Sequence, residues 1–244
     1  LTDEQQMMVD SAREFLRDAC PLATVRDWEK LPDRYPREIW ARMAEMGWTG
    51  AIYPEAFGGL GLTNLDMALL MREMGRVALP SPILSTVLLA GRAILAGGSE
   101  AQKQGLLPKI AAGEVLLSFA LTEASARPDA ATVRTSARAV GDGYVLNGTK
   151  HFVEFAEQAG QMLVVARTSE SANPGQGLTM FLVDARAPGI EYIPLQTLAL
   201  QPQAKVVLKD VRVAATGVVG RVDHAWAVLD PVIQAATAIV CAYM

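Results

Sequence analysis

Cysteine and histidine are scarce in this sequence, and their positions exclude several kinds of site. The 244 residues contain two cysteines, Cys20 and Cys241, and two histidines, His151 and His224. This set offers neither a Cys-x-x-Cys pair nor the clustered ligands of a zinc site. No charged-then-apolar leader precedes the first polar segment, so we expect a protein of the reducing cytoplasm without a bound metal.

An excess of positive charge and long hydrophobic runs are also missing. The formal net charge is -4 at pH 7, and the intermixed signs offer no basic stripe for a nucleic-acid backbone. The longest apolar stretch, residues 83–95, is interrupted by polar residues and Gly91, which favours a buried helix over a membrane span. Hydrophobic residues still make up 51% of the chain, and we expect partner subunits to cover part of that surface. The composition therefore predicts a soluble protein that binds neither nucleic acid nor a membrane.

Helical periodicity dominates the first 113 residues. Thr2 and Gln5 fit a capping box for a helix that ends before Pro21. Further helices are predicted to begin at Pro36, Asn64, Ser81-Pro82 and Ser99. The helix that begins at Pro36 is predicted to end at Gly47, and the helix that begins at Asn64 is predicted to end at Gly75. No convincing strand appears in this part of the chain.

After Gly113 the pattern alternates between apolar and polar residues. Strands are predicted at residues 133–139, 144–146, 161–167, 178–184 and 205–213. Short strands separated by turn residues predict an antiparallel barrel or sandwich. Helical spacing returns from Asp223, and nothing caps this last helix before Met244.

The pattern thus predicts a multidomain α+β protein in three parts. A helical N-terminal domain is expected at residues 1–114 and an antiparallel β-barrel-like middle domain at residues 115–222. Residues 223–244 are expected to form the first helix of a truncated C-terminal helical bundle.

Recognisable catalytic motifs are few. Gly58-Gly59-Leu60-Gly61 suggests a phosphate loop, but it follows a helix and a Tyr-Pro segment instead of a strand, which favours a structural turn. Glu123 follows an apolar run and has two interpretations: a buried catalytic acid, or a strand-end residue that accepts backbone N–H bonds. The second is favoured, so residue patterns alone assign no chemistry.

Several short motifs occur in a fixed order along the chain. They are Met46-Gly47-Trp48-Thr49-Gly50, Tyr53-Pro54-Glu55, Phe57-Gly58-Gly59-Leu60-Gly61, Arg72-Glu73-Met74-Gly75-Arg76, Gly98-Ser99-Glu100-Ala101-Gln102-Lys103, Phe119-Ala120-Leu121-Thr122-Glu123 and Leu146-Asn147-Gly148-Thr149-Lys150. Any one of these is weak evidence. In this order and spacing, they strongly resemble the acyl-CoA dehydrogenase family.

The resemblance implies FAD as the cofactor and an acyl-CoA thioester as the substrate of an α,β-desaturation. In the family, a carboxylate removes the α-proton while the β-hydrogen leaves as hydride to the flavin. It also implies an electron-transfer flavoprotein-type acceptor and a homo- or hetero-oligomer, either a dimer or a tetramer.

Residue roles are carried over by the same resemblance. The implied cofactor-binding residues are Phe119, Leu121, Thr122, Phe152, Val153 and Glu154. The usual catalytic Glu of the family lies well beyond Met244. Some members place the base on the first helix of the third domain, where Asp230 is the candidate in this chain.

The sequence departs from the family after Thr122-Glu123, where the family commonly continues Pro-Gly-x-Gly-Ser-Asp. Arg127 and Pro128 stand where Gly and Ser would meet the cofactor and substrate phosphates. Pro128 has no N–H to donate, whereas Arg127 offers a bidentate phosphate contact, so both are candidate substrate-binding positions. Glu154 replaces Thr or another small residue, and we expect it to turn away from the flavin.

These departures resemble a bacterial subgroup that assembles as heteromers in the breakdown of bulky acyl-CoAs such as steroid side chains. One subunit of such a pair can have a degenerate flavin site, so a noncatalytic partner subunit is one alternative. The other alternative is a relative that uses oxygen as acceptor, such as an acyl-CoA oxidase or a flavin monooxygenase.

Overall fold

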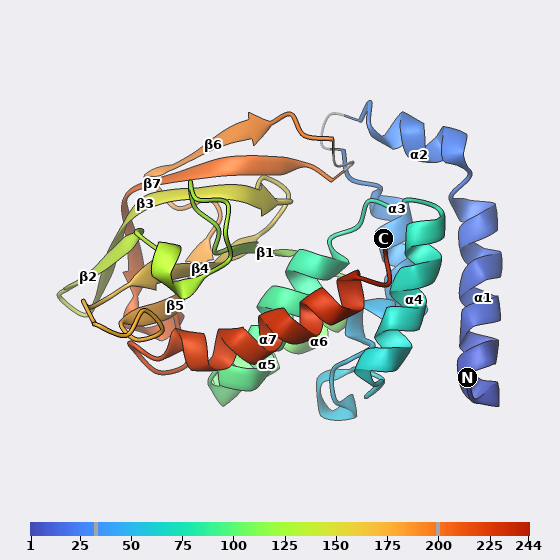
Figure 1. The fold of residues 1–244 in the computed structure, drawn as a ribbon, viewed down its shortest axis with the longest axis horizontal. Helices are drawn as coiled ribbons and strands as arrows, with labels where there is room; N and C mark the ends of the chain where they lie inside the picture. The colour runs from blue at the N-terminus through green and yellow to red at the C-terminus, as the bar shows by residue number, and fades with distance from the viewer. Residues whose placement is uncertain (32–33, 199–200) are drawn as a thin grey trace.

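Helices make up the first half of the chain and strands most of the second half (Figure 1). The computed structural model describes residues 1–31, 34–198 and 201–244. The helices of the first half are α1 (Asp3–Ala19), α2 (Leu22–Trp28), α3 (Arg37–Glu45), α4 (Asn64–Arg76), the π-helix η3 (Ile83–Gly91), α5 (Arg92–Gly97) and α6 (Glu100–Ala111). The strands are β1 (Leu117–Ala120), β2 (Ser136–Val140), β3 (Gly143–Glu154), β4 (Gln161–Arg167), β5 (Leu178–Asp184), β6 (Ile190–Leu195), β7 (Gln203–Ala214) and β8 (Val218–Val219), and the last helix is α7 (Ala225–Val240).

Side-chain caps begin several of the helices. The capping box of Thr2 and Gln5 starts α1, and that of Ser99 starts α6, as the sequence predicted. Gly47 has the left-handed conformation (φ +77°) that was predicted beyond α3. The prediction that Gly75 ends its helix was wrong, because α4 continues to Arg76.

The strands form one mixed, open sheet in the order β6-β7-β3-β2-β4-β5-β8, with β1 pairing parallel to β4 off this path. The predicted antiparallel barrel is therefore corrected to an open sheet, in which β2 also meets β4 in parallel. The strands predicted at residues 161–167 and 178–184 coincide with β4 and β5. The strand predicted at residues 133–139 begins only at Ser136, because the N–H groups of Arg134 and Thr135 donate to the Glu123 carboxylate.

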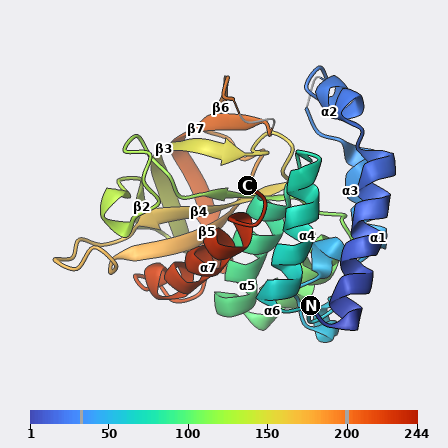
Figure 2. The ribbon, with the colours of Figure 1, turned by 45° about the vertical axis from the view of Figure 1, so that its right-hand side comes forward.

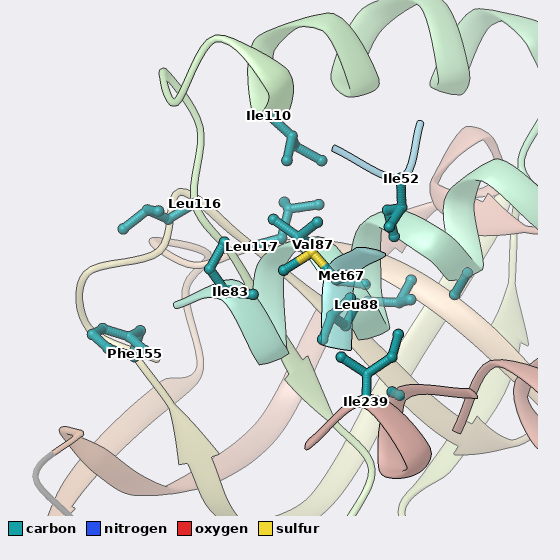
Figure 3. Packing of buried hydrophobic residues seen from close by; sticks show 14 of the residues in the cluster. Ile52, Met67, Ile83, Val87, Leu88, Ile110, Leu116, Leu117, Phe155 and Ile239 are labelled. Atoms are coloured by element: carbon teal, nitrogen blue, oxygen red, sulfur yellow. The ribbon is translucent and has the colours of Figure 1, made fainter. Parts of the chain in front are cut away.

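Strand β4 contributes to two hydrophobic cores. Its side chains alternate, so Met162 and Val164 enter a core within the sheet domain, while Leu163 and Val165 enter the main core. The main core continues into the helices, and Figure 3 shows part of it, from Ile52 and Met67 to Phe155 and Ile239. The helical part and the sheet thus share one interior.

Helix α7 lies between the sheet and the helical part (Figures 1 and 2). It packs against α4, α5, η3 and β5. The residues that follow it form a turn, and the Tyr243 hydroxyl donates to the Leu79 carbonyl at 3.0 Å. Across the described ranges, no helix combines the length and the apolar character needed to cross a membrane.

Candidate functional site

An apolar cleft of about 220 Å³ lies where β1, η3 and α7 meet. Its lining residues are Leu84, Leu89, Phe119, Leu121, Thr122, Pro128, Ile233, Ala236, Thr237 and Val240. The four from α7 stand at positions i, i+3, i+4 and i+7, so a single stripe of that helix faces the cleft. Thr122 and Thr237 provide the polar side chains of an otherwise hydrophobic wall.

The structure brings together half of the predicted cofactor-binding residues. Phe119, Leu121 and Thr122 lie side by side on one wall of the cleft, at the end of β1. The hydroxyl of Thr122 has no hydrogen-bond partner within the described part of the chain. This wall therefore presents an aromatic ring, an aliphatic side chain and an available hydroxyl.

The other three predicted residues, on β3, do not line this cleft. The register between β3 and β7 shifts between Lys150 and Val153, and this irregularity places Phe152 at φ +55°. Phe152 is 45% exposed, which is unusual for an aromatic residue, whereas Val153 is buried in the sheet core. A left-handed conformation in a non-glycine residue costs about 1 kcal/mol or more and often marks a functional position.

Glu154 is half-buried near the end of β3. Burial raises the pKa of its carboxyl to about 7, although a hydrogen bond with Gln203 opposes the shift. Its negative charge also helps to raise the pKa of Tyr243 to about 12, after the larger effect of burial on that phenol. Glu154 thus lies close to the turn that follows α7 and is not among the residues that line the cleft.

A buried ion pair holds the cleft wall in place. The Lys150 ammonium, which is fully buried, lies 2.7 Å from a carboxylate oxygen of Glu123 and also donates to the Leu121 carbonyl at 3.1 Å. The backbone N–H of His151 donates to the Thr122 carbonyl at 2.8 Å. Strand β3 is therefore fastened to the segment that carries Leu121 and Thr122.

The Glu123 carboxylate also closes the loop that follows it. Its two oxygens accept the N–H groups of Arg134 and Thr135 at 2.8 and 2.9 Å. Burial alone would raise the pKa of Glu123, but the Lys150 charge and these hydrogen bonds hold it below its usual value. Burial also lowers the pKa of Lys150 to about 8. The interpretation of Glu123 as an acceptor of backbone N–H bonds agrees with this geometry, except that the donors come from the far end of the loop.

The two substrate-binding candidates in that loop differ in position. Pro128 lines the cleft, whereas Arg127 is exposed and does not. Asp230 lies on α7 one turn before the first cleft residue of that helix, Ile233. Its carboxylate accepts a hydrogen bond from Gln234 at 2.8 Å and does not line the cleft.

Sequence reasoning missed two components of this site. Lys150 was treated only as part of a motif, although a lysine within a predicted strand, close to an isolated Glu123, is a recognisable signal for a buried pair. The stripe of α7 that faces the cleft was visible as helical periodicity, but its partner surface on β1 depends on the tertiary fold. Among the described residues, no three His, Cys, Asp or Glu side chains are grouped as metal ligands.

The cleft suits one part of a flavin better than another. Its apolar walls and the free Thr122 hydroxyl match a flat aromatic ring with a polar edge. The part of the loop expected to meet the phosphates fits less well. Pro128 lines the cleft there, and proline has no N–H to donate. The residues present therefore fit the ring, and Arg127 is an exposed cation of this loop that could meet phosphate groups.

Two protein-family descriptions match the chain over most of its length. "Acyl-CoA dehydrogenase, N-terminal domain" matches residues 2–114, and "Acyl-CoA dehydrogenase, middle domain" matches residues 118–211. An acryloyl-CoA reductase (NADH) of Anaerotignum propionicum is 34% identical over 228 residues, which cover 91% of this chain and 57% of that protein. The chain thus spans little more than half the length of this curated relative.

Solved structures show the same arrangement. An acyl-CoA dehydrogenase from Geobacillus kaustophilus superposes with a TM-score of 0.89 at 28% identity, covering 100% of this chain and 65% of that one. A chain of the ChsE4-ChsE5 complex from Mycobacterium tuberculosis gives a TM-score of 0.85 at 27% identity, covering 96% and 60% of the two chains.

Proposed function

The chain belongs to the acyl-CoA dehydrogenase family, and from this premise we propose that the whole protein carries out flavin-dependent α,β-desaturation of an acyl-CoA thioester. The observation that supports this function is the cleft where Phe119, Leu121 and Thr122 face the apolar stripe of α7. We further propose that residues 1–114 form its N-terminal domain, residues 115–222 its middle domain and residues 223–244 the first helix of its C-terminal domain, in the cytoplasm, within an oligomer.

The residues of this chain would position the reactants. When bound, FAD supplies the hydride acceptor. Phe119 and Leu121 would pack against the flavin ring and exclude water from it, while the Thr122 hydroxyl would donate to its polar edge. The exposed Phe152 would cover the flavin from the side of β3, and the α7 stripe would hold the acyl chain by hydrophobic contact. Of the acids in this chain, Asp230 is the candidate base, one turn from that stripe.

Flavin binding by this chain tests the proposal directly. We expect the purified protein to bind FAD, visible as yellow colour and flavin absorbance. Thr122→Val should weaken FAD binding by about two- to tenfold, because one hydrogen bond is worth about 0.5–1.5 kcal/mol. Thr216→Val, at an exposed threonine outside the cleft, is the matched control and should leave the affinity unchanged.

Activity is then measured with the full-length protein, a panel of acyl-CoAs and an artificial electron acceptor. Formation of the enoyl-CoA product supports the proposal. A protein that binds no flavin at saturating FAD and forms no enoyl-CoA would reject it.

A noncatalytic partner subunit is the second candidate. It is favoured by Arg127 and Pro128, which replace the family's Gly and Ser, and by similarity to a chain of a two-component complex. Co-expression with the product of a neighbouring gene tests it. A stable complex in which only the neighbour binds FAD would support this role, whereas flavin bound by the isolated chain would exclude it.

A further inference from the structure

A second cleft, of about 370 Å³, lies between the segment that leads into β2 and the end of β4. Its lining residues are Arg134, Ser136, Ala137, Arg138, Arg167, Thr168, Ser169 and Glu170. Arg134, Ser136 and Arg138 alternate with buried residues, so their side chains leave the same face of the extended segment. Two guanidinium groups thus flank one hydroxyl along a wall of the cleft.

The charge of this cleft is mainly positive. Three arginines line the cleft, and Glu170 is the one carboxylate among its lining residues. The guanidinium of Arg167 is fixed by hydrogen bonds to three carbonyl oxygens, those of Ala130, Val133 and Gln176, at 3.2, 3.4 and 3.1 Å. These bonds fix the position of the charge without neutralising it, since no carboxylate takes part.

The other two arginines are available to a ligand. Within the described ranges, the guanidinium groups of Arg134 and Arg138 make no hydrogen bond or ion pair, and both residues are exposed. Arginine binds phosphate through two parallel N–H···O bonds, and two arginines that approach from either side suit a phosphate ester or diphosphate. The backbone N–H of Arg134 donates to the Glu123 carboxylate at 2.8 Å, which anchors this end of the wall.

The same loop connects this cleft to the apolar one. Pro128 lines the apolar cleft and Arg134 lines the basic cleft, and Glu123 closes the loop that carries them. A ligand with an apolar end and a phosphorylated end could therefore contact both sides of this one loop. We propose that Arg134 and Arg138 bind the phosphate groups at the nucleotide end of the coenzyme A carrier, an assignment that rests on the proposed function.

Titration calorimetry of the 244-residue chain tests this site. The probes are coenzyme A, adenosine 3′,5′-bisphosphate, pantetheine, inorganic phosphate, FAD and riboflavin. We expect Arg134→Gln/Arg138→Gln to weaken coenzyme A and the bisphosphate about tenfold or more, because charged hydrogen bonds are lost, and to leave pantetheine unchanged. Glu170→Gln should tighten both phosphorylated ligands about twofold by removing the opposing charge.

Matched controls separate this site from general charge effects. Arg212→Gln removes an exposed arginine of β7 outside the cleft and should leave every affinity unchanged. Coenzyme A that binds the double variant as tightly as the original protein would overturn the proposal. The proposal would also be overturned if the double variant bound FAD more weakly, while its affinities for riboflavin and coenzyme A stayed unchanged. The arginines would then bind the diphosphate of the flavin cofactor. An arginine-dependent affinity for inorganic phosphate alone, with coenzyme A unaffected, would equally reject it.

The result can be told apart from a failure of the proposed function. Adenosine 3′,5′-bisphosphate needs no flavin and no catalysis to bind. A chain that binds the bisphosphate through Arg134 and Arg138 but binds no FAD would support this site while rejecting catalysis by the chain.

Discussion

The Glu123 carboxylate makes three contacts that together shape the cleft wall: one with Lys150 and two with backbone N–H groups. Removing one member of a buried pair leaves the other charge uncompensated, whereas removing both does not. The pair is therefore expected to be strongly coupled energetically, even if its net contribution to stability is small.

A double-mutant cycle measures that coupling. Glu123→Gln and Lys150→Met should each lower the free energy of unfolding by about 3–5 kcal/mol. The double variant should lose less than the sum by about 2 kcal/mol or more, as measured by urea unfolding. Strictly additive losses would show that the two groups do not act as a pair. An exposed ion pair, Lys209 with Glu191, is the control and should show a coupling below about 1 kcal/mol.

Glu154 makes the stability depend on pH in the opposite sense to a salt-bridged acid. Its carboxyl has a pKa of about 7 in the folded protein and an ordinary value of 4.5. Between these values the unfolded chain binds fewer protons than the folded one, so this residue lowers stability as pH rises from about 4.5 to 7. Glu154→Gln should remove that loss, which makes the variant more stable than the original protein at pH 8 by about 2 kcal/mol.

Unfolding in urea at pH 5 and pH 8 checks this expectation. The difference between variant and original protein should grow with pH. Glu157→Gln, at an exposed carboxyl on the following turn, should show no such trend. A pH-independent difference for Glu154→Gln would contradict the prediction.

At the scale of elements, α4 and the end of the chain approach each other closely at Gly75. A Cβ added there would lie 1.9 Å from the Tyr243 carbonyl oxygen. Gly75→Ala should therefore destabilise the protein by about 1–3 kcal/mol, although alanine is normally the better helix former. Gly105→Ala in α6 is the matched control, because nothing lies within 4 Å of its added Cβ, and it should stabilise by up to about 1 kcal/mol. Thermal unfolding of both variants tests the difference in sign.

Gly75 also shows where sequence reasoning succeeds and fails for the elements. The caps of α1 and α6 were predictable because Thr2 and Ser99 act on residues three positions away. The role of Gly75 was not, because its constraint comes from Tyr243, far along the chain. The late start of β2 was missed for the same reason, since Glu123 takes the N–H groups that an earlier strand would use.

The candidate site was predictable to a similar extent. Family resemblance indicated Phe119, Leu121 and Thr122, which lie together in the cleft. The placement of the α7 stripe opposite β1, in contrast, depends on how distant segments pack. Lys150 required a pairing between residues 27 positions apart.

At the scale of the whole molecule, the two cores meet across β4. Val164 and Val165 are adjacent and fully buried, and they belong to different cores. The tryptophans that report on unfolding, at positions 28, 40, 48 and 226, lie on the side of the main core. A sheet strand shared by both cores should make the chain unfold as one cooperative unit.

Two neighbouring substitutions test that cooperativity. Val164→Ala and Val165→Ala each remove two buried methyl groups, so each should lower the free energy of unfolding by about 2 kcal/mol. Both should shift the urea midpoint equally whether unfolding is followed by tryptophan fluorescence or by far-ultraviolet circular dichroism. If Val164→Ala shifted only the circular dichroism transition, the sheet core would be unfolding separately from the helices. The two walls of the cleft between β1 and α7 would then stay together, because Leu121 and Ala236 both belong to the main core.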